Sequence, residues 1–395
     1  SLVSTDDVRE IQFFENPLVG QEGGIFSRIP FASLVFWKYV QLMLFPVHLS
    51  YYYGYNEIPL VDYQDPLAWL AMLSVIGLLV GIWLKKRNDR VLVFGIVFFL
   101  VALAGYLNLV MPVVGIIAER FLFVASIGGA VILSWVFFKL NQTSVNQYFE
   151  YKYLNKKVKY ILGILIVYYS VQIWMRNPDW KSEKTLFTND LQHLDNSVKA
   201  HVLYADMLRA ELFRQNTGSR DPRIDDAIEH YQRAIDLYPQ HISAINSIAF
   251  MDFAFRGNKS KPIELLHYAL EIDSNHARTH FNLGIVYQAD NQFERAVEHY
   301  RKELSIDQSN PDSYGRMQKC LMNLKDTTAA LQVNEEAMEK FPAIADFPIN
   351  VANIWGYRGD TLQAIQYFDK ALQLNPSNAK LRQHVQRLKA EQGVL

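Results

Sequence analysis

Cysteine is nearly missing from this sequence of 395 residues, and its rarity excludes several kinds of site. Cys320 is the one cysteine, so the chain forms no intrachain disulfide and no thiolate metal cluster. An excess of charge of one sign is missing too, because 39 basic and 40 acidic side chains leave a net charge of -1. A nucleic-acid surface needs a basic stripe that neutralises phosphates. We therefore expect no nucleic-acid partner.

Motifs for cofactors and for common catalytic arrangements are missing as well. The sequence contains no glycine-rich phosphate loop, no motif of a Ser-His-Asp catalytic triad, and no pair of carboxylates at a spacing that indicates catalysis. The histidines of the C-terminal half scatter without the i, i+4 pairing beside a carboxylate that marks a zinc hydrolase. We expect no cofactor and no metal. These histidines are His201, His230, His267, His276, His280 and His299.

Long hydrophobic runs are what the first half does have. Four runs are long and apolar enough to cross about 30 Å of hydrocarbon as helices. A further stretch, about 29–49, contains Lys38 and ends near the helix breaker Pro46, so it either spans the membrane or lies in the interface. We predict a loop domain over residues 1–65 and a transmembrane domain over 66–176. Its spans are expected at about 66–84, 91–110, 121–138 and 160–175.

Basic residues predict the orientation of these spans. By the positive-inside rule, the two connectors rich in lysine and arginine are cytoplasmic. Parity then places residues 50–65, the loop 108–119 and everything after Met175 on the outer side. We expect an integral protein of a bacterial inner membrane or of the endoplasmic reticulum, with an extracytoplasmic or lumenal C-terminal half. The connectors carry Lys85, Lys86, Arg87 and Arg90, and Lys152, Lys156, Lys157 and Lys159.

Two charged residues, Glu119 and Arg120, stand at the mouth of the third span. Charged side chains at that depth are costly unless they are paired or meet a charged ligand. One interpretation is an arginine that reaches lipid phosphate, with Glu119 as its neighbour. The other is a site for the phosphate of a lipid-linked substrate, which the guanidinium fork suits. Both interpretations stay open.

From about Val198 the apolar pattern changes to paired amphipathic helices in units of 34 residues, as Ala296, Ala330 and Ala364 show. This period and its small and aromatic residues match the tetratricopeptide repeat. The small residues let two helices approach closely, and the aromatics fill the gap between units. The predicted class is all-α, a polytopic transmembrane helical domain followed by an α-solenoid. We expect a linker over 177–197, about five repeats over 198–379, and a capping helix with a tail over 380–395.

One register on the first helix of successive repeats faces the concave surface. Asparagine amides there would hold a peptide backbone, and an arginine would hold a carboxylate. The alternative is a groove that is merely solvated. The predicted acceptor or peptide groove consists of Ser247, Asn282, Arg316 and Asn350.

Several short strings resemble the transmembrane and tetratricopeptide repeat-containing O-mannosyltransferases and their bacterial relatives, which are glycosyltransferases of the GT-C fold. The strings follow the family's order from Glu15 to the first repeat. Tyr52 and Gly54 depart from the pattern, because the family often has an Asp and a Ser there. The strings are Glu15-Asn16-Pro17, Phe45-Pro46 with Leu49-Ser50 and Ile58-Pro59-Leu60, Ala118-Glu119-Arg120-Phe121-Leu122 with Ser126-Ile127-Gly128, and Arg176-Asn177 with Asp179-Trp180-Lys181 and Thr185-Leu186-Phe187.

The resemblance implies a transfer of sugar, mannose in the family, from a polyprenyl phosphate to a serine or threonine of an extracytoplasmic protein. Arg120 would stabilise the departing lipid phosphate, and Glu119 would orient Arg120. Asn16, Tyr52 and Tyr53 would line the donor chamber, and the repeats would bind the acceptor. The family's catalytic carboxylate lies in the first outer loop of a longer membrane domain. We therefore expect this chain to be a C-terminal portion that lacks it.

Two other functions stay open on the residues alone. A non-enzymatic, membrane-anchored scaffold for envelope assembly or secretion is one, because repeat arrays are commonly adaptors. An enzyme similar to an O-antigen ligase or polymerase is the other. It would also use a lipid-linked glycan, but it would build polysaccharide and not modify protein.

Overall fold

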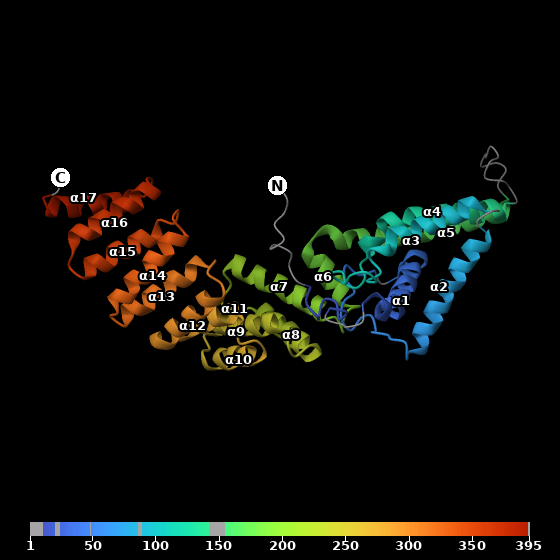
Figure 1. The fold of residues 1–395 in the computed structure, drawn as a ribbon. Coiled ribbons are helices and arrows are strands. Elements are labelled where there is room, and N and C mark those ends of the chain that lie inside the picture. Colours follow the sequence, from blue (N-terminus) through green and yellow to red (C-terminus); the bar gives the residue numbers. More distant parts are fainter. Residues whose placement is uncertain (1–10, 20–23, 48, 86–88, 142–154, 394–395) are drawn as a thin grey trace. The chain divides into compact units, whose positions relative to one another are not determined.

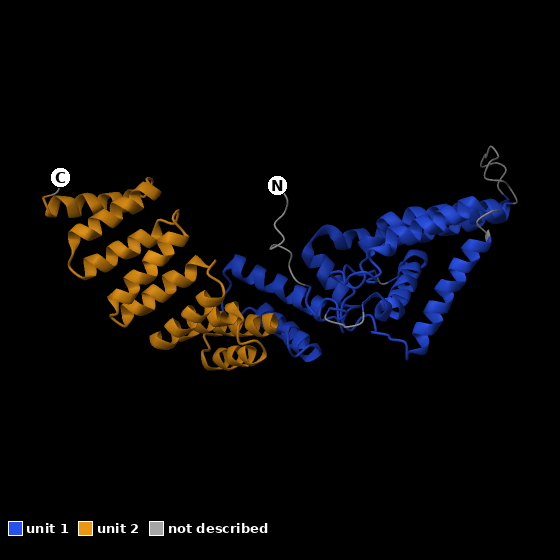
Figure 2. Ribbon diagram, viewed as in Figure 1, with its two compact units in different colours: residues 1–241 blue, residues 242–395 orange. Residues whose placement is uncertain are grey.

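The computed structural model describes residues 11–19, 24–47, 49–85, 89–141 and 155–393, and its regular elements there are all helices (Figure 1). An isolated antiparallel bridge joins Tyr53 to Ile117. The predicted all-α class is confirmed. The chain forms two compact units, unit 1 over residues 1–241 and unit 2 over residues 242–395 (Figure 2). Lys86, Arg87 and Lys152, which we used to predict orientation, lie outside the described residues.

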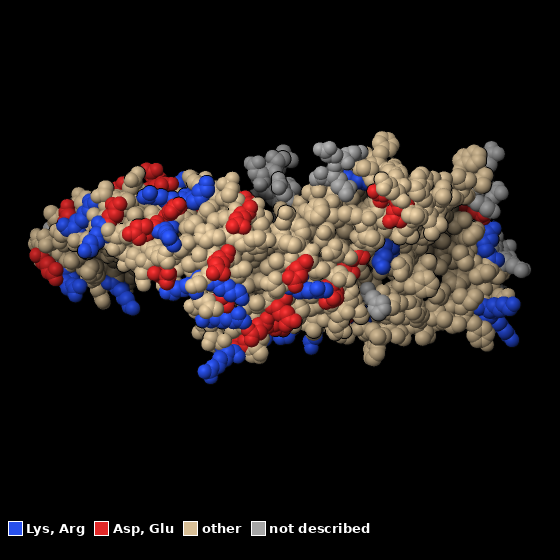
Figure 3. Space-filling model, turned by 90° about the horizontal axis from the view of Figure 1, so that it is seen from below, with Lys and Arg blue, Asp and Glu red and all other residues tan. Residues whose placement is uncertain are grey.

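Three helices of unit 1 are long and apolar enough to cross a membrane. Few of their side chains are buried inside the protein, as expected of helices that face lipid. This part of unit 1 is largely uncharged on the face seen in Figure 3, whereas charges of both signs are interspersed over the repeats. These features point to membrane association. The candidate spans, Pro66–Leu84, Glu119–Leu140 and Lys156–Lys181, contain α2 (Pro66–Lys85), α4 (Leu122–Leu140) and α5 (Lys156–Arg176).

The second predicted span is shorter than expected. We predicted a helix over 91–110, whereas α3 is Arg90–Ala104. Its 15 residues cover about 22 Å, less than the roughly 30 Å of a hydrocarbon core. The chain leaves the helical path because Asn108 adopts a positive φ of 59° and its side chain hydrogen-bonds to Asn16. The remainder of the apolar run therefore belongs to an ordered loop.

The stretch predicted at 29–49 forms α1 (Gly24–Leu44), which starts and ends earlier than expected. The helix ends two residues before Pro46, because a proline ring blocks continuation of a helix. Eight residues of α1 are buried, and Phe31, Val35 and Tyr39 lie in the core of unit 1. It is not among the three helices with spanning character. α1 is therefore a core helix of unit 1.

Connecting segments of unit 1 gather at the two ends of its helices. At one end, Lys139 of α4 forms an ion pair with Asp89, which precedes α3, at 3.2 Å. At the other end, the loop before α2 meets the loop before α4, because Tyr53 and Ile117 exchange two backbone hydrogen bonds. The two loops that we predicted on the outer side are thus in direct contact.

Residues 177–197, predicted as a linker, contain regular structure. A short 3₁₀ helix, η4 (Asn177–Lys181), is followed by α6 (Glu183–Leu191). Ser182 starts α6 with a capping box, in which its side chain and that of Thr185 each accept a backbone N–H from the other residue. The segment is an ordered joint between α5 and the first repeat.

Five helix pairs and a last helix follow this joint. The first pair belongs to unit 1 and not to the rest of the array, because Lys199 pairs with the buried Glu15 at 3.0 Å and His241 contacts the ring of Phe14. The first repeat helix begins at Val198, and the compact units divide one repeat later, at residue 241. The helices are α7 (Val198–Gln215), α8 (Pro222–Leu237), α9 (Ile242–Arg256), α10 (Ser260–Ile272), α11 (Ala277–Ala289), α12 (Phe293–Ile306), α13 (Pro311–Asn323), α14 (Thr327–Lys340), α15 (Asp346–Tyr357), α16 (Thr361–Leu374) and α17 (Ala379–Glu391).

The small residues of the repeat pattern lie where helices meet. Ala296 and Ala330 are fully buried in the core of unit 2. Gly284 of α11 faces Tyr300 of α12, and a Cβ at Gly284 would lie 2.5 Å from that ring. Close packing of the two helices therefore requires glycine at this position.

Candidate functional site

Arg176, the last residue of α5, lies at the centre of a cluster of three carboxylates. Its Nη2 donates to Glu119 at 2.9 Å, and its Nη1 donates to Asp179 at 3.0 Å and to Asp190 at 2.6 Å. The Arg176 side chain is 12% exposed. Charges withdrawn from water are costly unless each has a partner. Arg176 therefore joins the end of α5 to η2 (Glu119–Phe121), η4 and α6.

Sequence reasoning placed Arg176 in a family-like string but gave it no role. Glu119 and Arg176 are 57 residues apart, and no period or spacing links them. The one available signal was chemical, since an arginine at the end of an apolar helix needs a partner. The sequence offered several carboxylates for that role, so it could not identify which ones are used.

Arg120 lies beside this cluster and has different contacts. Its guanidinium stacks over the rings of Tyr51, at 5.1 Å, and Phe121, at 4.9 Å, and it donates to the Tyr51 carbonyl at 3.5 Å. Arg120 is exposed and forms no ion pair with a carboxylate among the described residues. Stacking on a ring face leaves the N–H donors in the guanidinium plane available. Arg120 therefore has donors available for an anion at the N-terminal end of α4.

The predicted contact between Glu119 and Arg120 is not present. Glu119 binds Arg176, so it does not orient Arg120. The physical reason is the local geometry, because consecutive residues of a 3₁₀ helix project about 120° apart. Adjacent charges in a sequence of this kind point to different neighbours.

Three residues predicted to line a donor chamber are buried and hydrogen-bonded within the protein. Asn16 donates to Asn108 at 2.7 Å and to the Val113 carbonyl at 2.9 Å. The Tyr52 hydroxyl donates to the Glu15 carbonyl at 3.0 Å. The Tyr53 hydroxyl accepts from the Ser50 N–H at 3.0 Å. These hydrogen bonds hold the loops of unit 1 together. The burial of the three side chains is therefore explained by the fold, and no bound ligand is needed to explain it.

An aromatic wall stands next to the two arginines. Tyr51 packs its ring edge-on against Trp180 at 6.0 Å and lies 6.3 Å from Phe187. Arg176 lies over Trp180 at 5.6 Å. The predicted chamber residues include Tyr52 and Tyr53 but not Tyr51. Side chains alternate along an extended segment, so sequence alone does not show which tyrosines face the charged residues.

The four predicted groove residues lie on α9, α11, α13 and α15 at intervals of 34 or 35 residues, but their surroundings differ. Asn282 is buried and donates to Asn246 at 2.8 Å, which ties α11 to α9. Arg316 pairs with Asp312 at 2.7 Å in its own helix. Ser247 and Asn350 are half-buried. Asn282 therefore serves the packing of the array, and Ser247, Arg316 and Asn350 remain candidates for a peptide.

Comparison with known families identifies the repeats. The tetratricopeptide repeat profile matches residues 279–314 and again residues 352–378. Among solved structures, a tetratricopeptide-repeat protein called YrrB, described as having an unusual peptide-binding site, aligns with a TM-score of 0.41 at 17% identity. The alignment covers 51% of this chain and 97% of that one.

Two human proteins are similar to a larger part of the chain. The human protein O-mannosyl-transferase TMTC1 is 28% identical over 215 residues, which are 53% of this chain and 23% of the relative. Human protein O-mannosyl-transferase TMTC3 is 25% identical over 287 residues, 69% of this chain and 29% of the relative. The repeats and the last helix make up about half of the chain, so the second match extends into the membrane half. The chain spans less than a third of the length of these two relatives.

Proposed function

We propose that this chain, a TMTC-like tetratricopeptide-repeat protein, acts in a membrane glycosyltransferase that modifies serine or threonine of extracytoplasmic proteins. The donor would be a polyprenyl-phosphate sugar, with mannose as the sugar that the relatives' names indicate. The repeats would bind the acceptor protein and raise its concentration at the membrane surface. The relatives do not favour a pure scaffold or a polysaccharide ligase.

The observation that carries this proposal is the exposed Arg120 at the start of a candidate spanning helix. In the transfer, the acceptor hydroxyl oxygen forms a bond to the anomeric carbon while the bond from that carbon to the phosphate oxygen breaks. The phosphate leaves with the electron pair, and the hydroxyl proton passes to a base that we do not assign in this chain. A guanidinium with free donors stabilises the charge that grows on the leaving phosphate.

The contact between the two loops that we predict on the outer side supports the same arrangement. The loop before α2, the loop before α4 and the end of α5 all meet near Arg176, while Asp89 and Lys139 mark the opposite end of the bundle. This alternation fits the topology that the basic connectors predict, with the repeats on the outer side. The donor phosphate and the acceptor would then be on one side of the membrane.

Substitution of Arg120 tests the proposal. In membranes that contain the full-length protein, Arg120→Ala should lower sugar transfer from a polyprenyl-phosphate donor by about 100-fold or more, and Arg120→Lys should lower it less. Arg90→Ala is the matched control, because it removes an exposed arginine from the opposite end of the bundle and should not change transfer. Unchanged transfer in the Arg120→Ala protein, with its melting temperature retained, would remove Arg120 from the site.

Labelling tests the predicted side of the repeats. Cys320 is fully buried, so it contributes little background to a thiol reagent. A Gln392→Cys substitution adds an exposed thiol after α17. In sealed spheroplasts or membrane vesicles whose outward face is the non-cytoplasmic one, a membrane-impermeant maleimide should label it. Labelling only after the membrane is opened would place the repeats in the cytoplasm and overturn the proposal.

A further inference from the structure

One position of the repeat pattern changes character in the third repeat. In the second helix of every repeat, the residue three before the helix end is buried, and its carbonyl accepts the backbone N–H of the residue that caps the helix. In the third repeat this residue is Glu303, whose exposed fraction is 3%. In the other four it is a fully buried alanine, namely Ala234, Ala269, Ala337 and Ala371.

A buried glutamate at this position costs more folding free energy than a buried alanine. Burial of a carboxylate costs free energy unless the charge is paired and hydrogen-bonded. Its hydrogen-bonding neighbours are neutral, since Asn310 donates to Oε1 at 3.3 Å and Ser313 supplies a hydroxyl, while Asp307 and Arg278 act on it through their charges. Oε2 has no hydrogen-bond partner, and no lysine or arginine forms an ion pair with Glu303, within the described residues. Burial accordingly raises the pKa of Glu303.

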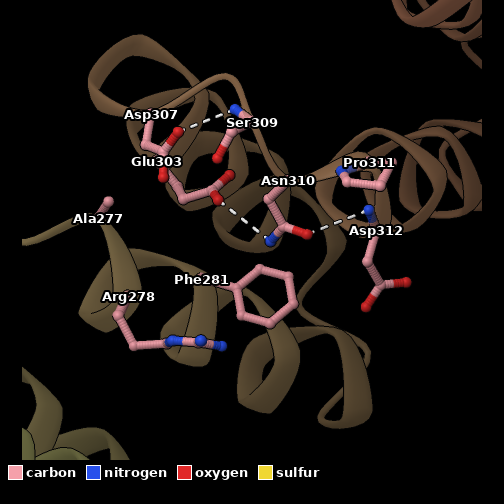
Figure 4. Close-up of a pocket in the computed structure, with 9 residues that line it drawn as sticks. All are labelled: Ala277, Arg278, Phe281, Glu303, Asp307, Ser309, Asn310, Pro311 and Asp312. Carbon is pink, nitrogen blue, oxygen red and sulfur yellow. Dashed lines mark hydrogen bonds between the residues drawn. The ribbon is translucent and has the colours of Figure 1, made fainter. Parts of the chain in front are cut away.

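A cavity of about 450 Å³ lies against Glu303. It is formed by the start of α11, the end of α12 and the start of α13, as Figure 4 shows. Phe281 supplies its apolar wall, and Asp307 and Asp312 are at its rim. Arg278 is the basic residue of the lining, and Figure 4 shows its side chain beside Phe281, over whose ring its guanidinium lies at 5.9 Å. The lining therefore carries three acidic residues and one basic one, and of the acidic residues Asp312 is already paired with Arg316 at 2.7 Å.

We propose that this cavity binds the cationic side chain, lysine or arginine, of a partner polypeptide, with Glu303 as its charge partner. The cation supplies the N–H donors that the buried carboxylate lacks. The apolar stem of such a side chain packs against an aromatic wall, which here is Phe281. The inference goes beyond the transfer of sugar, because the site would serve an acceptor or any other partner with a basic residue.

Peptide binding to the full chain in detergent micelles tests this site. The probes are two labelled peptides that are identical except for one residue, acetyl-Gly-Ser-Lys-Ser-Gly-amide and the same peptide with norleucine in place of lysine. We expect the lysine peptide to bind at least about 10-fold more tightly, since a charged hydrogen bond that forms away from water is worth that much. Equal affinity of the two peptides would overturn the proposal.

Substitutions separate the charge of Glu303 from its structural effect. Glu303→Ala restores the residue of the other four repeats, so the melting temperature should stay or rise while the preference for lysine disappears. Glu303→Gln keeps the shape without the charge, and it should also lose most of that preference. Glu294→Ala, which removes an exposed carboxylate from the same helix, is the control and should bind like the unchanged protein. A preference for lysine that survives both Glu303 substitutions would disprove the assignment.

The outcome is distinguishable from a failure of the transferase proposal. The binding assay contains no lipid donor, and Glu303 lies in unit 2 while Arg120 lies in unit 1. The effect of Arg120→Ala on sugar transfer therefore tests the transferase proposal alone. The effect of the Glu303 substitutions on the preference for lysine tests the cavity alone.

Discussion

The two units of this protein satisfy their polar groups over very different distances along the chain. In unit 1, Arg176 reaches Glu119 across 57 residues, and Lys199 reaches Glu15 across 184. In unit 2, Tyr300 binds Gln288 across 12 residues and Asn282 binds Asn246 across 36. A repeat array is stabilised by contacts between neighbouring repeats, whereas unit 1 depends on contacts between loops that are distant in the sequence. A destabilising substitution should therefore lower the stability of all of unit 1, whereas in unit 2 it should affect only its own repeat and the neighbouring ones.

The sharpest test of this difference is Arg176→Ala. The substitution leaves Glu119, Asp179 and Asp190 around a half-buried site without their common partner. Breaking a buried ion cluster in this way costs about 3–5 kcal/mol of unfolding free energy. Thermal unfolding in detergent should show that unit 1 of the variant melts at a much lower temperature than unit 1 of the unchanged protein. A loss as small as that of Arg120→Ala, which removes an exposed arginine, would contradict the central role of the cluster.

A substitution inside one repeat should have a smaller and local effect. The Cβ of Gly284→Ala would lie 2.5 Å from the Tyr300 ring, so α11 and α12 must separate. We expect a loss of about 1–3 kcal/mol from overpacking, confined to unit 2. Gly315→Ala is the matched control, because its Cβ meets nothing within 4 Å and alanine is the better helix former. Hydrogen exchange can show whether only the third repeat and its neighbours lose protection.

Acid should weaken unit 2 through a pair of histidines. His280 and His299 face each other with their Nδ1 atoms 3.0 Å apart, and His280 Nε2 lies 3.1 Å from the Ser274 carbonyl. The pair can hold both bonds only while one Nδ1 is unprotonated. Burial lowers the pKa of His299 to about 4 and also lowers the pKa of His280.

The sign of the effect follows from these shifts. Because the folded pKa values are below the unfolded value of about 6.5, the unfolded chain binds more protons as pH falls. The stability that His299 contributes is complete above about pH 6.5 and declines from there toward pH 4, by up to about 1.4 kcal/mol per pH unit, and His280 shifts stability in the same direction. Melting temperatures at pH 7.5 and 5.5 measure the loss, which His299→Gln should reduce. A flat profile in the unchanged protein would count against the pair.

The smallest predicted effects separate two asparagines of the same register. Asn282→Ala removes a buried hydrogen bond to Asn246 and should cost about 1 kcal/mol. Asn350 is half-buried on α15, and Asn350→Ala should change stability by less than about 0.5 kcal/mol. Denaturant titration of the two variants makes the comparison. Equal losses would show that Asn350 also serves the packing of the array.

The parts of the fold that the sequence predicted are those with a period. The 34-residue spacing of Ala296, Ala330 and Ala364 predicted the paired helices, and apolar runs predicted α2, α4 and α5. The end of α3 was missed because the hydrophobic run continues past Ala104, whereas the turn at Asn108 depends on a contact with Asn16. Hydropathy counts residues along the chain and does not register such a contact.

The candidate site was predictable only in its chemistry. The sequence indicated an arginine and a glutamate at the mouth of a span, and both lie there in the structure. It could not show that Glu119 pairs with Arg176. Nor could it show that the polar side-chain atoms of Asn16, Tyr52 and Tyr53 form hydrogen bonds within the loops of unit 1. The change from alanine to Glu303 was readable in the sequence, but only the cavity beside it suggests a use.

The sequence by itself determined the two classes of structure, because the length of an apolar run and the period of small residues are properties of the local chain. Tertiary structure alone decided which charges are neutralised and which stay free. Arg120 and Arg176 are alike in the sequence, yet one is exposed and the other is enclosed by three carboxylates. Pairing depends on where distant segments meet in space, and no spacing along the chain encodes that distance.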